Sequence, residues 1–243
     1  MLPAAGTTMA RAMPLLPESE SSGQARLRLW QLLSPTLPVG AFSFSGGLEA
    51  AVAAGWLPDR EAVAHWIRGQ LLHGQARVDI PMLKRLHQSW RANDQAAVER
   101  YAAFLRANRE SAELAAEDRH VGQALARLLR DLEISDAERW VGHERSAWAV
   151  LFALALVRWD IPLDEGAEAY LWSWCDNQVA AAIKLVPLGQ TDGQRLLLSL
   201  GQAIQSAAAE GLSLPEQAVG GGMPGLAIAS CWHEIQYSRL FRS

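Results

Sequence analysis

Apolar residues recur at helical spacing along nearly the whole chain, and the alternation that is typical of strands is almost absent. Residues 169–194 carry the clearest example of this spacing. One side of the expected helix there is formed by Leu171, Trp174, Cys175, Ala181, Ala182 and Leu185. Prolines and glycines divide the rest of the chain into further segments of the same kind. The sequence therefore predicts an all-α fold, a single compact bundle of about ten helices with no sheet.

The composition indicates a protein that buries a large core. Of 243 residues, 50% are hydrophobic, and the net charge of −4 gives no reason to expect nucleic acid or an anionic membrane as a partner. The longest fully apolar run, residues 147–157, is shorter than the roughly 20 residues that a membrane span needs. It predicts a helix buried on all sides. The two cysteines, Cys175 and Cys231, fit a reducing cytoplasm better than a disulfide framework.

The chain is expected to consist of an N-terminal tail and one helical domain. Residues 1–23 contain several prolines and the run Glu-Ser-Glu-Ser-Ser, which predict a disordered tail. Residues 24–243 are expected to form the helical domain. Its expected helices include residues 24–33, 106–132 and 143–158 and a last helix that begins at Pro224.

Local signals predict several helix ends. Asp59 and Asp79 are expected to be N-caps, because an aspartate side chain can accept hydrogen bonds from the first free backbone N–H groups. Thr191 and Gln194 have the spacing of a capping box, and Gly211 is expected to end the helix that they begin.

Residues 34–49 are rich in side chains that constrain the backbone. Prolines forbid a regular helix there, glycines permit unusual backbone angles, and two phenylalanines can fix the segment to the body. The residues concerned are Pro35, Pro38, Gly40, Phe42, Phe44, Gly46 and Gly47. Two interpretations stay open, a loop that fills a gap in the core and a loop that presents a recognition surface.

Polar residues interrupt the apolar helix that is expected within residues 169–194 and that Pro187 ends soon after Lys184. They are Asp176, Asn177, Gln178 and Lys184. Buried polar groups without partners cost about 1–3 kcal/mol each, so packing alone does not call for them. One interpretation is a satisfied core network with Lys184 reaching solvent at the end of the helix. The other is a binding site.

No arrangement of residues in the sequence indicates catalysis. The pairs His143-Glu144 and His233-Glu234 each lack the second histidine of a zinc-protease helix, and neither a phosphate-binding glycine loop nor a Gly-x-Ser-x-Gly motif occurs. Cys231 and His233 are two residues apart, so on a helix they point away from each other and could share a metal only across a dimer. A structural role for both is favoured. The sequence therefore indicates a binding or scaffolding protein rather than an enzyme.

Four long stretches resemble the family of urease accessory protein F (UreF). They are LLSPTLPVGAFSFSGGLEAAVAAGWL, ANRESAELAAEDRHVGQAL, AYLWSWCDNQVAAAIKLVPLGQTDGQRLL and GLAIASCWHEIQYSRLFRS. The resemblance covers residues from about 26 to 243 in the same order. The family usually has tyrosine and glutamine where Phe44 and Gly46 stand, and commonly glutamate where Asp176 stands.

The resemblance implies a function in urease maturation. A protein of this family is expected to be an all-α homodimer in the cytoplasm that binds accessory protein D (also called H), recruits the GTPase accessory protein G and docks on apo-urease. It is expected to act as a chaperone and adaptor that couples GTP hydrolysis to nickel incorporation. It is expected neither to be an enzyme nor to bind a cofactor tightly. The dimer contacts are expected near residues 147–174.

The resemblance assigns one group of site residues, and the residue types of the C-terminal end indicate a second. The surface that faces the GTPase is expected to include Pro38, Glu49, Asp79 and Lys184. The tail of residues 236–243 is expected to bind accessory protein D, because aromatic, aliphatic and arginine side chains of this kind are enriched at interface hot spots. Its anchors are Gln236, Tyr237, Arg239, Leu240, Phe241 and Arg242. The alternative is that Leu240 and Phe241 fold back on the body.

Two other functions compete with this interpretation. A helical enzyme or small-molecule-binding protein could use Asp176, Asn177 and Lys184 as its site, and an oligomeric scaffold could have no connection with urease. Saturable ligand binding by the isolated chain would favour the former, and failure to bind urease components would favour the latter.

Overall fold

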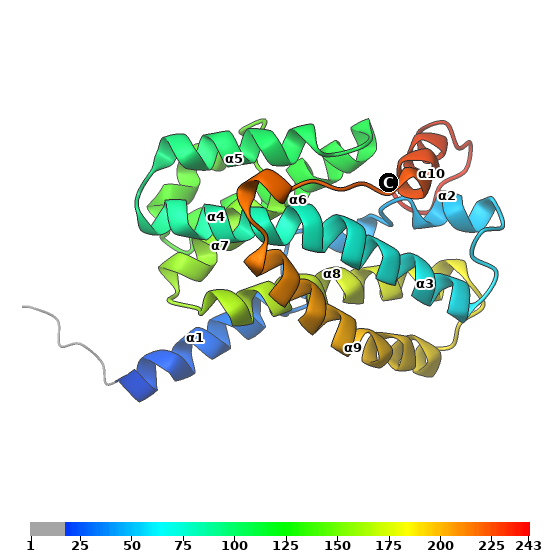
Figure 1. Ribbon diagram of the computed structural model, residues 1–243, viewed down its shortest axis with the longest axis horizontal. Coiled ribbons are helices and arrows are strands. Elements are labelled where there is room, and N and C mark those ends of the chain that lie inside the picture. Colours follow the sequence, from blue (N-terminus) through cyan, green and yellow to red (C-terminus); the bar gives the residue numbers. More distant parts are fainter. Residues whose placement is uncertain (1–17) are drawn as a thin grey trace, which may run out of the picture.

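The computed structural model describes residues 18–243, and within this range every regular element is helical (Figure 1). The α-helices are α1 Glu18–Leu33, α2 Leu48–Ala53, α3 Arg60–Gln70, α4 Ile80–Arg91, α5 Gln95–Ala107, α6 Ala112–Asp131, α7 Trp148–Arg158, α8 Leu163–Leu185, α9 Gln190–Ser213 and α10 Pro224–Glu234. Short 3-10 turns occupy Ala41–Ser43, Ser135–Trp140 and Glu216–Ala218, and a π-helical segment occupies Leu71–Asp79. The predicted all-α fold with about ten helices and no sheet is confirmed for this part of the chain.

Helix α7 lies at the centre of the core. All of its residues from Ala149 to Leu156 are buried, because its sequence is apolar on every side and α4 and α6 pack against it. The predicted buried helix is confirmed, although it begins at Trp148 rather than at residue 143. These side chains are covered within one chain, and the expected dimer contacts near residues 147–174 stay a prediction.

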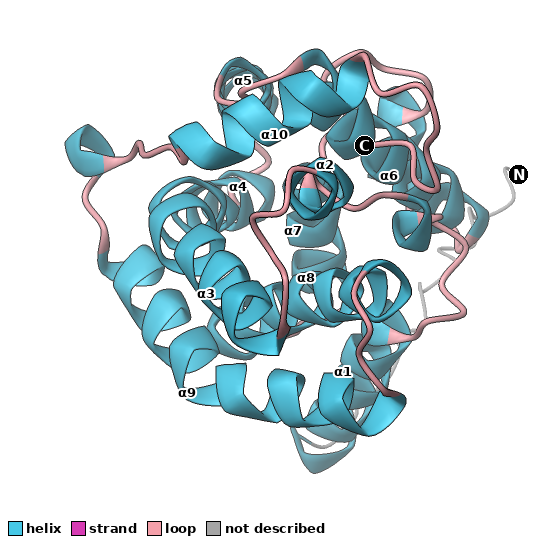
Figure 2. Cartoon of the chain, turned by 90° about the vertical axis from the view of Figure 1, so that its right-hand side faces the viewer, coloured by secondary structure: helices cyan, strands magenta, loops and turns pink. Residues whose placement is uncertain are grey.

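Helix α8 runs through the middle of the molecule and packs against α9 (Figures 1 and 2). Gly166 lets α8 approach α7 closely, since a Cβ atom on this glycine would lie 2.4 Å from Leu156 Cδ1. Gly193 does the same between α9 and α8, where a Cβ atom would lie 2.4 Å from Ile183 Cδ1. This close packing fixes the position of α8, whose polar side chains Asn177 and Gln178 contact the loop before α2.

Residues 60–91 form one continuous helical rod through α3, the π-helical segment and α4. Asp59 is its N-cap as predicted, and Ala62 N donates to Asp59 Oδ1 over 2.9 Å. The prediction that Asp79 caps a separate helix is wrong, because Asp79 has helical backbone angles and its side chain makes no capping bond. Pro81 has no N–H to donate, and the wider π turns accommodate it while Arg77 O accepts from Gly220 N over 3.1 Å.

Several other helix ends differ from the sequence-based expectation. Helix α1 begins at Glu18 rather than at residue 24, and the rest of the expected disordered tail, residues 1–17, lies outside the described residues. Residues 106–132 are not one helix, because Ser111 caps α6 and accepts from Leu114 N over 3.1 Å. Helix α9 begins at Gln190 without a side-chain cap and continues past Gly211 to Ser213, so the capping box at Thr191 is also wrong.

The segment that follows α10 returns to the body and ends beside the loop before α2 (Figure 1). It brings residues 239–243 next to residues 43–49, which lie almost the whole length of the chain away in sequence. Figure 2 views the molecule from this end. Among residues 18–243, no helix combines the length and the apolar character that crossing a membrane requires.

Candidate functional site

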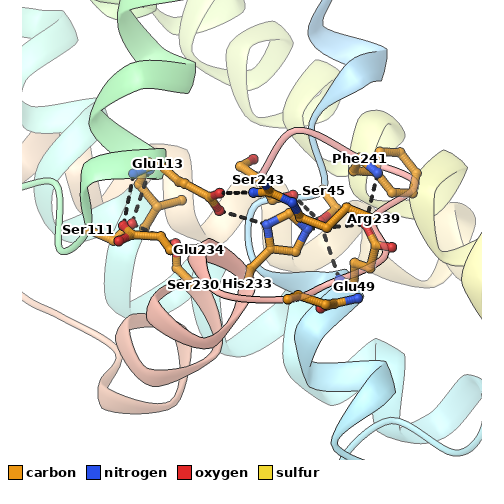
Figure 3. Close-up of polar contacts among 12 residues, drawn as sticks. Ser45, Glu49, Ser111, Glu113, Ser230, His233, Glu234, Arg239, Phe241 and Ser243 are labelled. Atoms are coloured by element: carbon orange, nitrogen blue, oxygen red, sulfur yellow. Dashed lines mark hydrogen bonds and ion pairs between the residues drawn. The ribbon is translucent and has the colours of Figure 1, made fainter.

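His233 occupies the centre of a buried polar cluster that joins α2, α6 and α10 (Figure 3). Its imidazole is fully buried, with Nδ1 2.7 Å from Glu113 Oε2 and Nε2 3.2 Å from Glu49 Oε2. Glu49 lies in the first turn of α2 and Glu113 in the first turn of α6, positions at which the helix dipole favours a carboxylate. Both ring nitrogens of His233 therefore face carboxylate oxygens.

The same two carboxylates also bind the returning C-terminal segment. The backbone N–H groups of Leu240 and Phe241 donate to the two oxygens of Glu49 over 2.7 and 2.8 Å. Arg239 Nη1 donates to Glu113 Oε1 over 2.7 Å. We call this arrangement, made of Glu49, Glu113, His233, Arg239 and the backbone N–H groups of residues 240 and 241, the C-terminal clasp.

Beyond the clasp, the last residues pair with the loop before α2. Arg242 N donates to Ser43 O over 2.9 Å, and Ser45 donates to Ser243 O both from its backbone N–H, over 3.0 Å, and from its hydroxyl. Ser243 Oγ in turn donates to Glu117 Oε2 over 2.6 Å. The alternative that Leu240 and Phe241 fold back on the body is therefore realised for Phe241, which is buried, whereas the side chain of Leu240 is exposed.

The polar residues of α8 hold the other side of the same loop. Asn177 Nδ2 donates to Phe44 O over 3.3 Å, and Gln178 Nε2 donates to Ser45 O over 3.2 Å. The loop thus lies between α8 and the C-terminal segment, and Ser45 is fully buried there. These contacts favour the interpretation in which the loop fills a gap in the core and Asn177 and Gln178 satisfy its backbone. Asp176 is half-buried, and burial raises its pKa above the ordinary value.

A cavity of about 180 Å³ lies next to this loop, between the π-helical segment, α6 and α8. Its charged and polar lining includes Asp79, Arg109, Glu117, Asp118, Tyr170 and Asn177. Arg109 Nη2 donates to Asp79 Oδ1 over 2.7 Å and Nε donates to Asp118 Oδ2 over 2.8 Å, while the Tyr170 hydroxyl donates to Asp79 over 3.1 Å. A buried cation between two carboxylates ties the three elements together.

The electrostatics of the cavity follow from burial and from these pairs. Burial alone would lower the pKa of Arg109, but the carboxylates of Asp118 and Asp79 outweigh that effect and raise the pKa well above its ordinary value. Burial, followed by the charge of Asp79, raises the pKa of Tyr170. Burial raises the pKa of Glu117 to about 7, against the opposing hydrogen bond from Ser243. Arg109 stays charged, Tyr170 stays neutral, and Glu117 titrates near neutral pH.

The residues assigned to the GTPase-facing surface differ in their solvent exposure. Pro38 and Lys184 are exposed, whereas Glu49 is buried in the clasp and Asp79 is buried beside the cavity. Lys184 connects to the clasp, because its Nζ lies 5.3 Å from the centre of the buried Phe241 ring. In this arrangement the charges of Glu49 and Asp79 are directed inward, and their role toward a partner stays a prediction.

The residues assigned to the C-terminal tail divide in the same way. Phe241 is buried and Gln236 is half-buried, while the other assigned side chains, Tyr237, Arg239, Leu240 and Arg242, are exposed. Cys231 is exposed on the other side of α10 from His233, whose ring nitrogens both have carboxylate neighbours. Within the described part of the chain, no three histidine, cysteine, aspartate or glutamate side chains are placed to hold a metal ion.

Four charged residues at and just before the start of α6 were missed from the sequence alone. Arg109, in the loop before α6, and Glu113, Glu117 and Asp118, in α6, were not assigned to any site, but they bind the clasp, the cavity and the C-terminal residue. A signal was present, since Glu113 and Glu117 continue the four-residue spacing of the buried Val121 and Leu125 toward the start of the helix. Their partners lie 120 and 126 residues away, and no local pattern indicates them.

Comparison with known proteins shows that this chain is similar to urease accessory proteins. Urease accessory protein UreF of Alkalilimnicola ehrlichii is 60% identical over 221 residues, which cover 91% of this chain and 97% of that relative. The UreF proteins of Hahella chejuensis and Teredinibacter turnerae are 44% and 45% identical and cover 90% and 89% of this chain and 98% of each relative. The model of the UreF family matches residues 57–201. The chain belongs to the UreF family.

Proposed function

We propose that this protein is the adaptor that, together with accessory proteins D and G, couples GTP hydrolysis to the incorporation of nickel into apo-urease. The observation that carries the proposal is the match to UreF proteins over nine-tenths of the chain at up to 60% identity. The protein works in the cytoplasm as a homodimer, holds no cofactor tightly, and acts on nickel as cargo of the complex. Its residues supply binding surfaces and no chemical step.

Contacts near the clasp support a division of labour among the assigned residues. Lys184 is exposed and its ammonium lies over the ring of Phe241. The affinity of a partner that binds Lys184 therefore depends on the position of the C-terminal segment. Glu49 and Asp79 act from below the surface, the former by holding residues 240 and 241 and the latter by fixing Arg109. Charges arranged in this manner set the register of a partner more than its raw affinity.

The experiment that tests the proposed function uses cells that express apo-urease and the other accessory proteins in nickel medium. Urease activity should depend on the presence of this chain. Lys184→Ala should lower urease activation while the purified variant unfolds at the wild-type denaturant concentration, because Lys184 is exposed. Arg127→Ala, which removes an exposed cation of α6, is the matched control and should activate normally. Activation that is equal in the two variants would contradict a role for Lys184.

The tail assignment needs substitutions that leave the clasp intact. Deleting residues 237–243 would remove Phe241 and Ser243 and disturb the body, so its effect on binding would be ambiguous. Tyr237→Ala and Leu240→Ala truncate exposed side chains instead and should weaken binding of accessory protein D in a pull-down or by calorimetry. Unchanged affinity in the double variant would exclude these side chains as anchors.

One observation keeps the alternative function open to test. The cavity of about 180 Å³ has apolar walls with a few polar and charged side chains, Asn177 among them, and this composition is typical of a small-molecule site. Saturable binding of a metabolite by the isolated chain, lost in Asn177→Ala, would favour the small-molecule-binding protein. Chain-dependent urease activation without such binding would favour the adaptor.

A further inference from the structure

We propose that His233 is a proton-linked latch: its doubly protonated ring holds the C-terminal clasp closed, and loss of one proton releases residues 239–243 from the loop before α2. The proposal rests on the arrangement of the clasp. Its consequence for partner binding, through the tail, rests on the proposed function.

The first argument is the hydrogen-bonding capacity of the ring. A neutral imidazole donates from one nitrogen and accepts at the other, whereas the imidazolium donates from both. Carboxylate oxygens lie 2.7 Å from Nδ1 and 3.2 Å from Nε2 of His233, and an ionised carboxylate can only accept. Only the imidazolium satisfies both contacts. In the neutral ring one lone pair would face Glu49 or Glu113 at hydrogen-bond distance.

The second argument is the local balance of charge. With the proton in place, Glu49, Glu113, His233 and Arg239 sum to zero, and His233 is completely shielded from water. Without the proton, Arg239 is the only cation among the described side chains that is bonded to either carboxylate; its side chain is 40% exposed and reaches Glu113 but not Glu49. Glu49 then has no cation within the clasp, although its side chain is only 8% exposed. A buried carboxylate without a neighbouring cation is costly, so loss of the proton favours rotation of Glu49 toward solvent.

The third argument links Glu49 to the tail. Both oxygens of Glu49 accept backbone N–H groups of the returning segment, and these two bonds fix residues 240 and 241. A rotation of Glu49 toward water breaks both bonds at once. Phe241 then loses its anchor on α2, and the pairing of Arg242 with Ser43 and of Ser243 with Ser45 loses its support.

Other titratable and charged groups surround the clasp and must be separated from His233 in a test. They are Glu117, His120, Lys184, Glu234 and Arg242. Glu234 binds the first N–H groups of α6, Lys184 lies over Phe241, and His120 packs against Phe44. Glu117 ionises near pH 7 and then accepts the Ser243 hydroxyl more strongly, which opposes release. The latch therefore requires that release follow His233 and not Glu117.

The experiment observes the ring and the tail in the same full-length protein by NMR. The chain has five phenylalanines and six histidines, so amide labelling of phenylalanine and ring labelling of histidine give simple spectra. Between about pH 5 and pH 9, the ring nitrogens of His233 should change from the doubly protonated to the neutral signature. The amide signal of Phe241 should lose its hydrogen-bonded shift with the same midpoint.

Substitutions assign the transition to the clasp. Glu113→Gln removes one carboxylate and should lower the midpoint of both signals by about one pH unit or more. Glu168→Gln, which neutralises an exposed carboxylate of α8, is the matched control and should leave the midpoint unchanged. Glu117→Gln should also leave it unchanged, and His233→Gln should make the Phe241 signal independent of pH.

Three results would overturn the latch. The first is a Phe241 signal that stays constant while His233 titrates, and the second is a His233 ring that keeps one protonation state over the whole range. The third is a midpoint that follows Glu117→Gln and not Glu113→Gln. If His233→Gln fails to fold, the wild-type titration and the Glu113→Gln shift decide the question without it.

Discussion

At the scale of single residues, Glu117 is a position at which two signals disagree. The helical spacing of α6 predicts that its side chain is buried, whereas its charge predicts that it is exposed. It lies one turn before the buried Val121 on the inner face of α6, in the wall of the cavity, and the hydroxyl of Ser243 donates to it. Burial raises the pKa of its carboxyl from 4.5 to about 7, because the charged form loses hydration there. A group of this kind makes the stability of the protein depend on pH.

The sign of that dependence follows from proton binding. The carboxyl of Glu117 has a higher pKa in the folded than in the unfolded chain, so its contribution is fully present below about pH 4.5 and is lost as the pH rises through about 7. Glu117→Gln cannot ionise and still accepts from Ser243. We expect this variant to exceed the wild type in free energy of unfolding at pH 8 by on the order of 2 kcal/mol and to match it near pH 5.

Urea denaturation at both pH values measures this difference. Glu168→Gln, at an exposed position on the outside of α8, should show the wild-type pH dependence and serves as the control. A Glu117→Gln variant whose stability falls between pH 5 and pH 8 as steeply as that of the wild type would contradict the assignment.

The residues of the site were predictable only in part. The resemblance to UreF proteins identified Glu49 and Lys184, but the chemistry of the sequence alone gave no reason to bury Glu49. Its partners are His233 and two backbone N–H groups, all more than 180 residues away. Burial of a carboxylate is decided by such partners, and these become adjacent only when α2, α6 and α10 have packed.

At the scale of elements, local sequence signals predicted the structure correctly where each signal is compatible with only one local structure. The apolar run of α7 and the cap at Asp59 each have one favourable solution, and both predictions are confirmed apart from the start of α7. Pro81 is compatible with two local structures, because a proline fits the first turn of a helix and also fits after a π turn that releases a carbonyl. The π turn is stabilised by Gly220, whose N–H donates to the released Arg77 O from a distant loop.

Gly211 is a second position at which packing overrode a local signal, and it yields a prediction. A glycine near a helix end is typical of a C-terminal stop, but α9 continues because Gly211 lies against α4. A Cβ atom there would lie 2.7 Å from Ile80 Cβ and 2.9 Å from Ala76 O. Gly211→Ala should therefore lower the free energy of unfolding by about 1–3 kcal/mol.

Gly201 in the same helix is the matched control. A Cβ atom at Gly201 meets nothing within 4 Å, so Gly201→Ala should raise stability by up to about 1 kcal/mol through helix propensity alone. Both variants are measured by chemical denaturation, with the slope of the transition unchanged and only its midpoint shifted. Equal midpoints for the two variants would mean that α9 can move away from Ile80 at no cost.

At the scale of the whole molecule, the fold is closed by contacts between the loop before α2 and the C-terminal residues. Ser45 and Ser243 are 198 residues apart in sequence and bonded through two donors on Ser45. The first turns of α2 and α6 each contribute a glutamate to the clasp, and α8 lies on the other side of the loop before α2. The fold class followed from periodicity, whereas this closure did not, because it is made by non-local polar pairs.

The closure predicts that the returning segment stabilises the entire protein. Only 6% of the surface of Phe241 is exposed, and the ammonium of Lys184 lies over its ring. Phe241→Ala should lower the free energy of unfolding by about 3 kcal/mol, since it removes a buried ring and leaves a cavity. Tyr237→Ala, four residues earlier and fully exposed, should change it by less than about 0.5 kcal/mol. Tryptophan fluorescence during denaturation follows the whole fold through ten residues. If Phe241→Ala left that transition in place and increased amide exchange only in the last residues, the segment would be an appendage rather than part of the core.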